Sequence, residues 1–375
     1  MASHDHSPAG DLLAGVPLDG RPSSGRLGSP APRRPADADP ALPAALGRLG
    51  RAATGSHTGV TVLADRQDAT VVRVGAVVVK AHPPEAEEGA LRRRLAVAAH
   101  PLTAASLLPP LSPASPREQG AAVPDGPGPH RVGGRLATLW PAGRPVDPRD
   151  PDAAPWEECG RLLAALHAVP LERLERDTGP LPPAGAPGRV TRALDILRRD
   201  VARGGPAWLR RAARAVEAAA GTVPPATRAP APGAPAPGAA APDGRVALTH
   251  GDFHLGQVVM APAGRWRLID VDDLGRGDPA WDLARPAAWY AAGLLPAAIW
   301  ERFMDAYLAA GGPCFRGTRT DLWGRLDPPA RALTVQMCAL RLAEAFREDR
   351  EPDEDEAALV AACERIAASG PAVLP

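Results

Sequence analysis

Short runs rich in valine and threonine alternate with polar turns in the part of the chain that follows residue 57. Residues 59–63, 69–74 and 76–80 form three such runs, separated by the polar stretch DRQD and by a glycine. A fourth run, 134–140, is closed by Pro141-Ala142-Gly143. The pattern predicts four strands, of which the first three form a meander that ends in Lys80.

Later in the chain the apolar residues recur at helical spacing. An early helix opens at Pro83-Pro84, with three glutamates in the first turn, where acidic side chains complement the helix dipole. Three short strands, 245–249, 258–260 and 265–270, interrupt the helical half. The helices predicted there cover 156–167, 190–201, 206–220, 281–292, 297–310, 329–346 and 355–368. This order predicts an α+β protein with a small strand-rich N-lobe and a larger, mostly helical C-lobe.

Two segments have a composition that is typical of disorder. Residues 1–57 are rich in Pro, Gly, Ser and charge, which predicts a disordered arm with room for one short helix around 41–53. Residues 223–244 are a run of Pro, Ala and Gly, which predicts an extended linker inside the folded region. The expected divisions are therefore the arm, an N-lobe and hinge over 58–142, and a C-lobe over 143–375.

Composition and charge exclude several classes of protein. The 43 basic residues equal the 43 acidic ones, which argues against a nucleic-acid binder with its basic stripe. No apolar run approaches 18 residues, so no membrane span is expected. The four cysteines lie far apart without a CxxC pair, which favours reduced thiols in a cytoplasmic protein. The sequence leaves the oligomeric state open.

One residue stands out against an arginine-rich background. Of the 43 basic residues 42 are Arg, and Lys80 is the single lysine. Lysine is a compact point charge on a flexible stem, unlike the planar guanidinium of arginine. Its position at the end of a predicted strand, just before an acidic helix start, makes it a candidate binding residue.

The densest set of chemical groups lies in the segments 249–260 and 266–284, which contain THGDFHLGQVVM and WRLIDVDDLGRGDPAWDLA. Asp252 and Asp270 are 18 residues apart, and a hairpin over 258–269 would bring them together with Gln257. Two carboxylates and an amide at one rim can hold Mg²⁺, which prefers oxygen ligands, and can orient a hydroxyl.

This cluster resembles the catalytic loop and metal motif of the aminoglycoside phosphotransferase and choline kinase family, which are relatives of the protein kinases. The family pattern is HGDxxxxN, then a strand that ends in ID, then DxxxDLA. The corresponding residues here are His250-Gly251-Asp252, Gln257, Ile269-Asp270, Asp278 and Asp282-Leu283-Ala284. The resemblance covers roughly 58–345 and implies a two-lobed, protein-kinase-like fold.

The resemblance implies a role for each residue of the nucleotide site. Lys80 would bind the α- and β-phosphates of ATP, and Glu88 would pair with Lys80 and hold it extended, although Glu85 and Glu87 remain alternatives. The backbone over Trp140 to Ala142 would bind the adenine edge.

The resemblance also implies the groups at the reacting end. Asp252 would accept the proton of an acceptor hydroxyl, while Gln257 and Asp270 would coordinate Mg²⁺ between the phosphates. Asp282 would support the catalytic loop by accepting backbone N–H bonds, with His250 beside it. Asp272 and Asp273 add negative charge beside Asp270, and one of the two is expected to approach a second metal or a cationic acceptor. The implied activity is ATP- and Mg²⁺-dependent phosphoryl transfer to a hydroxyl of a small molecule such as an aminoglycoside, sugar or amino alcohol.

Some features depart from the family pattern and leave alternatives open. Gln257 replaces the usual Asn, and the form HGDxHxGQ is also similar to bacterial maltose kinases, which raises a maltose-type sugar kinase. No GxGxxG covers the phosphates, and 64–68 is the only loop expected in that place. A catalytically weak nucleotide-binding regulatory protein is the second alternative.

Overall fold

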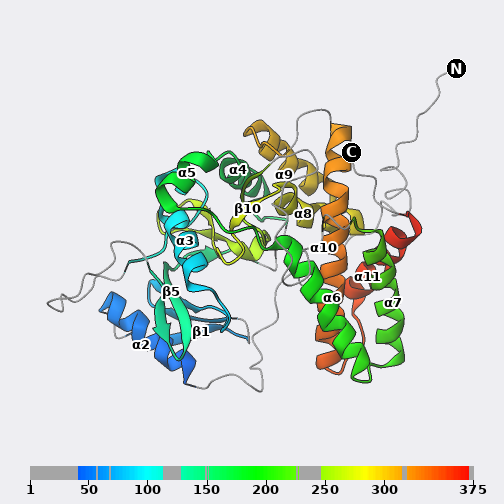
Figure 1. Ribbon diagram of the computed structural model, residues 1–375, viewed down its shortest axis with the longest axis horizontal. Helices are drawn as coiled ribbons and strands as arrows, with labels where there is room; N and C mark the ends of the chain where they lie inside the picture. The colour runs from blue at the N-terminus through cyan, green and yellow to red at the C-terminus, as the bar shows by residue number, and fades with distance from the viewer. Residues whose placement is uncertain are drawn as a thin grey trace.

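The computed structural model describes residues 41–55, 58–66, 69–112, 128–147, 150, 152–224, 227, 246–314 and 319–370. Figure 1 shows a sheet with a flanking helix at the left end of the molecule and a group of long helices at the right end. The predicted two-lobed α+β architecture is confirmed. The predicted linker over 223–244 falls almost entirely outside the described residues.

A five-stranded antiparallel sheet forms the small lobe. Its strands are β1 (Val60–Asp65), β2 (Thr70–Val74), β3 (Val77–Ala81), β4 (His130–Val132) and β5 (Arg135–Pro141), in the order β1-β2-β3-β5-β4. Successive side chains of a strand point to opposite faces. Val77 and Val79 are therefore buried in the apolar cluster on one face, and Lys80 lies on the other face. The middle strand β3 thus carries the single lysine toward the rest of the molecule.

Helix α2 (Leu42–Thr54) covers the apolar face of this sheet and corrects the expected extent of the arm. Leu42 and Leu46 are buried among Val72, Val79 and their neighbours, and α2 contacts β1, β2 and β3. Pro43 in its first turn and the left-handed Gly55 after its end are typical helix boundaries. The short helix allowed for around 41–53 is therefore present, and it packs on the sheet instead of belonging to a disordered arm. Residues 1–40 lie outside the described residues.

The remaining elements build the larger lobe. Helix α3 (Glu88–Ala99) connects the sheet to it. Two small sheets, β6-β8-β9 and β10-β7, consist of β6 (Arg144–Pro145), β7 (Ala247–Thr249), β8 (Val258–Met260), β9 (Trp266–Leu268) and β10 (Gly275–Gly277). The helices are α4 (Trp156–His167), α5 (Leu171–Thr178), α6 (Ala186–Ala202), α7 (Ala207–Thr222), α8 (Ala280–Ala292), α9 (Ala297–Ala309), α10 (Arg319–Arg347) and α11 (Glu354–Ala368).

Three of these helices, α6, α8 and α10, pack around the loop that follows β7. Helix α10 contacts both α6 and α8, while α4 packs on α9 and α11 on α7 (Figure 1). Helix α8 follows directly after β10, which pairs with β7. The loop after β7 is therefore held next to the start of α8 and within reach of α6 and α10.

Several element boundaries differ from those predicted. Helix α3 begins at Glu88 rather than at Pro83-Pro84, because Glu87 caps it by accepting the N–H groups of Gly89 and Ala90. Helix α10 starts at Arg319 and continues through two prolines, ten residues before the predicted start. The short elements β4, α5 and β10 were not predicted.

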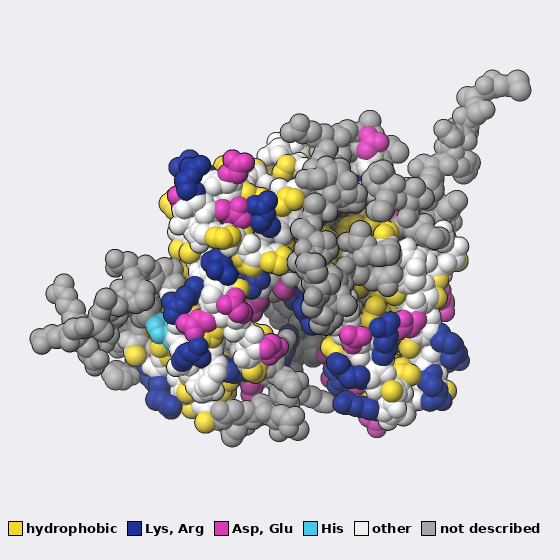
Figure 2. Space-filling model, viewed as in Figure 1, with side chains coloured by type: hydrophobic (Ala, Val, Ile, Leu, Met, Phe, Trp, Pro, Cys, Tyr) yellow, Lys and Arg dark blue, Asp and Glu magenta, His cyan; other side chains and the backbone are white. Residues whose placement is uncertain are grey.

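None of the helices that the structure describes is long and apolar enough to cross a membrane. Basic and acidic side chains mix over the described part of the face shown in Figure 2, where no basic stripe is visible.

Candidate active site

The loop that follows β7 begins with His250 and Gly251, and a buried carboxylate fixes both. The Asp282 side chain accepts the backbone N–H of His250 at 2.6 Å and that of Gly251 at 2.8 Å. Gly251 has φ 83°, and a Cβ there would lie 2.2 Å from the backbone oxygen of Asp273. Only glycine fits such a left-handed, crowded position. Asp282 therefore makes the contacts predicted for it, and the next residue, Asp252, is presented on a rigid turn.

Asp282 is itself held by a chain of buried groups. His167 Nε2 lies 2.9 Å from its carboxylate, and His167 Nδ1 lies 2.9 Å from the hydroxyl of Tyr307. Burial acts to raise the pKa of Asp282, but the hydrogen bonds from His167 and from the His250 backbone outweigh it and hold the pKa below its usual range. Asp282 thus remains an acceptor for the loop N–H groups. His250 completes the loop by donating from Nε2 to the Ile269 carbonyl at 2.8 Å.

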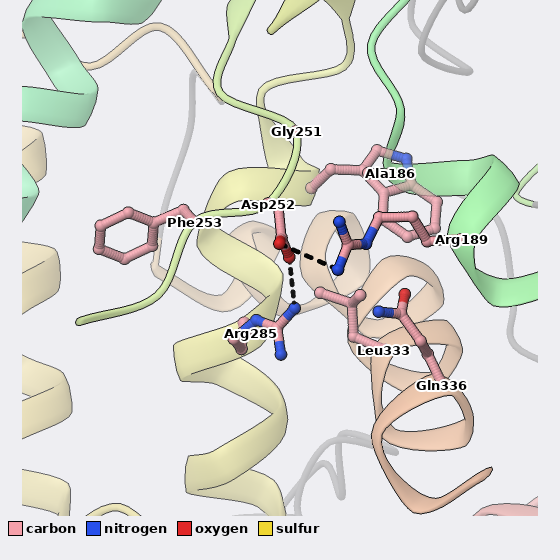
Figure 3. Close-up of a pocket in the computed structure, with 9 residues that line it drawn as sticks. Ala186, Arg189, Gly251, Asp252, Phe253, Arg285, Leu333 and Gln336 are labelled. Atoms are coloured by element: carbon pink, nitrogen blue, oxygen red, sulfur yellow. Dashed lines mark hydrogen bonds and ion pairs between the residues drawn. The ribbon is translucent and has the colours of Figure 1, made fainter. Parts of the chain in front are cut away.

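Asp252, the predicted proton acceptor, is enclosed by two arginines that the sequence analysis did not select. Arg285 of α8 reaches one carboxylate oxygen at 2.7 Å, and Arg189 of α6 reaches the other at 3.0 Å. Figure 3 shows the two guanidinium groups converging on Asp252, with Leu333 and Gln336 of α10 beside them. In a chain with 42 arginines, residue type gives no signal for these two positions.

Asp270 and Lys80 form the second centre. Lys80 Nζ lies 2.6 Å from one oxygen of Asp270 and 2.9 Å from Asp272. Burial acts to lower the pKa of Lys80, but the two carboxylates outweigh it and raise the pKa well above its usual value. The backbone of Asp270 is left-handed, with φ 67°, a conformation that Asp tolerates better than most residues. The turn after β9 thus aims Asp270 at the lysine on the facing sheet.

Asp272 faces the sheet, which differs from the expected approach to a second metal or a cationic acceptor. Besides Lys80 it contacts His82 Nδ1 at 2.7 Å, and His82 Nε2 lies 2.8 Å from the Thr138 hydroxyl. The sequence analysis missed His82, although a signal existed. His82 follows Lys80 by two residues, and residues two apart in a strand share a face.

Gln257 lies where a metal ligand is needed. Its side-chain amide donates to the second oxygen of Asp270 at 3.3 Å, so amide and carboxylate are adjacent. No group of three or more His, Cys, Asp or Glu side chains converges as a metal site within the described residues. A magnesium ion needs only one or two carboxylates when phosphate and water supply the rest. The Asp270–Gln257 pair, with its oxygen donors, fits that requirement.

The predicted ion pair between Glu88 and Lys80 is wrong. Glu88 at the start of α3 turns to the surface, where it binds Arg92 at 2.7 Å and Arg131 at 2.5 Å. Glu87 is occupied in capping α3, and no contact joins Glu85 to Lys80 among the described residues. The lysine is instead held by Asp270 and Asp272, which come from the other lobe.

Part of the segment predicted to bind the adenine edge already makes hydrogen bonds within the protein. The N–H of Ala142 donates to the Ala76 carbonyl at 2.8 Å. Trp140 is buried in β5 and its indole N–H donates to Thr138 at 2.8 Å. The structure therefore does not leave the Ala142 N–H free for a base.

The two-lobed fold and the site are those of a phosphotransferase. The sequence profile described as the phosphotransferase enzyme family matches residues 59–328. The chain therefore belongs to this family, and the resemblance found in its motifs is confirmed.

Several solved structures are similar to this chain. Aminoglycoside phosphotransferase APH(4)-Ia is similar with a TM-score of 0.50 and 14% identity, over 87% of this chain and 99% of that chain. A choline/ethanolamine kinase family protein from Mesorhizobium loti gives a TM-score of 0.47 and 17% identity, over 84% and 89%. The macrolide 2'-phosphotransferase MphH from Brachybacterium faecium gives 0.41 and 19%, over 85% and 98%. No curated protein matches the chain.

Proposed function

We propose that the protein transfers the γ-phosphate of ATP, with Mg²⁺, to a hydroxyl of a small molecule. The observation that carries the proposal is the meeting of Lys80 with Asp270 at 2.6 Å, across 190 residues of sequence. Phosphoryl transfer depends mainly on positioning and charge neutralisation, for which a cation and a metal-binding carboxylate are needed. The free thiols of all four buried cysteines favour a reducing compartment such as the cytoplasm.

Lys80 binds the phosphates in this mechanism. Ion pairs with Asp270 and Asp272 hold the Lys80 side chain extended, so its position does not depend on a further acidic partner. When the nucleotide enters, Lys80 exchanges part of its contact with Asp270 for phosphate oxygens and remains anchored by Asp272. Asp272 is fixed for this purpose by His82.

Asp270 and Gln257 would hold the magnesium ion, which supplies positive charge to the phosphate oxygens. Asp270 is free for this when Lys80 has moved to the phosphates. The side-chain oxygen of Gln257 can take the place of the usual Asn oxygen, because the extra methylene only lengthens its reach.

Asp252 acts on the acceptor. It takes the hydroxyl proton as the acceptor oxygen forms a bond to the γ-phosphorus and the bond from that phosphorus to the β-phosphate oxygen breaks, which releases ADP. The loop anchored by Asp282 keeps Asp252 in line for this step. A positioned proton acceptor of this kind contributes roughly 10²–10⁴ in rate.

Measurement of ADP release with purified protein, ATP and Mg²⁺ over aminoglycosides, sugars and amino alcohols tests the proposal. With an acceptor found, Asp252→Asn should lower turnover by about 10²–10⁴ and leave Mg-ATP binding close to that of the unmodified protein. Asp270→Asn should weaken both. Asp195→Asn, an exposed change on α6, is the matched control and should alter neither.

Two results would contradict the assignment. Loss of nucleotide binding in Asp252→Asn with retention in Asp270→Asn would exchange the two roles. Thermal stabilisation by Mg-ATP without turnover of any hydroxyl compound would favour the regulatory alternative. A maltose-type acceptor would be identified in the same screen by activity on disaccharides alone.

A further inference from the structure

The cavity next to Asp252 lies between α6, α8 and α10 (Figure 3). Because Asp252 is the proposed proton acceptor, this cavity is where the proposed function places the acceptor hydroxyl. Two guanidinium groups, Arg189 and Arg285, line it together with a single carboxylate, Asp252. Burial acts to lower the pKa of Arg285, and Asp252 offsets this only in part, so the pKa stays below its usual value. The charge of Arg285 is therefore only partly offset by Asp252, and the nearby Arg189 lowers its pKa further. Arg189 differs, because Asp252 and Asp273 together outweigh burial and raise its pKa.

The largely buried guanidinium group of Arg285 depends on Asp252 for the compensation of its charge. Within the part of the chain that the structure describes, Asp252 is its one ion-pair partner, and its buried Nε has no hydrogen-bond partner. Arg189 is shared, with Asp273 at 2.6 Å in addition to Asp252. When Asp252 turns its oxygen to an acceptor hydroxyl, Arg285 loses the contact that compensates its buried charge. Leaving a buried charge without a partner is costly.

Gln336 adds a second polar group to the lining of this cavity. Gln336 of α10 is 1% exposed, and its side-chain oxygen has no hydrogen-bond partner among the described residues. Buried polar atoms are almost always hydrogen-bonded, and exceptions often mark a ligand site. Gln336 lines the cavity beside Leu333, so its side-chain oxygen can accept a hydrogen bond from one donor of a ligand, such as a hydroxyl.

The small volume of the cavity limits which acceptors can bind next to Asp252. The cavity is about 10 Å³, which is room for one water, because Arg189 and Arg285 close over Asp252. An acceptor must therefore replace the contacts between these arginines and Asp252. A carboxylate or phosphate can accept the same hydrogen bonds, whereas a neutral hydroxyl is a weaker acceptor and an ammonium group is repelled.

We propose that the acceptor carries an anionic group, a carboxylate or a phosphate, beside its reactive hydroxyl, and that Arg189 and Arg285 bind this group. The inference rests on the proposed function and narrows the acceptors of its screen to anionic ones. The anion draws the arginines away from Asp252, and the freed carboxylate then receives the hydroxyl. Polycationic aminoglycosides and amino alcohols are poor acceptors on this basis.

A matched series of sugars that differ in charge tests the inference. The full-length protein is loaded with AMP-PNP and Mg²⁺, which fills the nucleotide site. Glucose, glucuronate, glucose 6-phosphate and glucosamine are then titrated by calorimetry, with inorganic phosphate as the smallest anion. The anions should bind at least about tenfold more tightly than glucose, and glucosamine more weakly, as charge-assisted hydrogen bonds require. Comparison of glucuronate with glucose 6-phosphate shows which anionic group is preferred.

Variants connect the preference to the arginines. Arg285→Gln and, separately, the more exposed Arg189→Gln should reduce the ratio of anion to glucose affinity toward one. Arg302→Gln on α9, which contacts Glu157, is the control and should keep the full ratio. Two variants are used because the buried Arg285 change is the more disruptive one.

The outcomes separate this inference from the proposed function. Tightest binding of glucosamine, equal binding of glucose and the anions, or no binding of any anion including phosphate overturns it. An equal loss for every sugar in the arginine variants also overturns it, because the arginines would then only position Asp252. If the anions bind as expected but no acceptor yields ADP, the proposed transfer activity fails and the anion site remains.

Discussion

Two single residues shape the carboxylate sites: Lys80 sets the charge around Asp270, and Gly251 sets the position of Asp252. Lys80 lies between Asp270 and Asp272 and supplies the positive charge that lets these two carboxylates lie close together. In the proposed mechanism the same lysine also binds the phosphates. Burial acts to raise the pKa of Asp272, but Lys80 and His82 outweigh it and lower the pKa far below its usual range. A change at Lys80 therefore has two separable effects, one on turnover and one on folding.

We expect Lys80→Ala to abolish most turnover and also to lower the free energy of unfolding by about 1–3 kcal/mol, because two partly buried carboxylates lose their counter-charge. The double variant Lys80→Ala/Asp272→Asn should regain much of that stability without regaining activity. Thermal unfolding and ADP release, measured on both variants, check this. Equal instability in the single and double variants would show that Asp272 is not the source of the effect.

Gly251 sets the position of Asp252, and its replacement is predicted to be far worse than that of an ordinary turn glycine. Gly251→Ala places a Cβ against the Asp273 backbone oxygen and should reduce both melting temperature and turnover strongly. Gly264→Ala has a similar positive φ, 73°, but open space around it, and should cost only about 1–2 kcal/mol. Similar losses in the two variants would contradict the crowding argument.

At the scale of elements, short-range patterns predicted the fold and long-range pairing decided the site. The valine-rich runs and the helical apolar spacing predicted four of the five strands of the sheet, both ends of α4, and the order of the lobes. The HGD and ID motifs likewise identified Asp252, Gln257 and Asp270 before their contacts were known. These features are local, so one sequence reveals them.

The missed contacts all join distant elements. The partner of Lys80 was expected on the helix that follows it, yet it comes from the turn after β9, because the capped start of α3 directs Glu88 to solvent. Arg189 and Arg285 lie on helices that meet only in the folded chain. Likewise, the sequence allowed a short helix around 41–53, but nothing local showed that its apolar face packs on the sheet.

Helix α2 is therefore predicted to be part of the stable core of the small lobe. Leu46→Ala should lower the free energy of unfolding by about 2–5 kcal/mol, since its side chain is fully buried against the sheet. Arg48→Ala, exposed on the same helix, should stay within about 0.5 kcal/mol. Chemical denaturation measures both. A truncation that removes residues 41–55 should likewise destabilise the protein, and unchanged stability would mean that the sheet does not need its cover.

At the scale of the whole molecule, one buried carboxylate and two half-buried ones make stability depend on pH in one direction. Asp270, Asp272 and Asp282 have pKa values held below the ordinary 3.8, by Lys80 for the first two and by His167 for the third, against the opposing effect of burial. A depressed carboxylate pKa contributes stability that is complete above the ordinary pKa and is lost as pH falls through the folded one.

The melting temperature should therefore be nearly constant between about pH 5 and 7 as far as these groups are concerned, and should fall below about pH 4. Asp272→Asn removes one of the three groups and should make this acid decline shallower. Scanning calorimetry across that range measures the slope. A decline of unchanged slope in the variant would show that Asp272 does not contribute to acid sensitivity.

The position of the single lysine in the middle strand of the sheet makes the chain a natural single-cut substrate for a lysine-specific endoprotease. The bond after Lys80 is paired on both sides, with Val71 of β2 and Thr138 of β5, so it is cleaved only when the sheet opens. When reclosing is fast, the cleavage rate reports the population of that opened state. Limited proteolysis therefore measures the local stability of the small lobe. If Lys80 binds the nucleotide as proposed, the nucleotide should slow the cut, and more so the more tightly it binds.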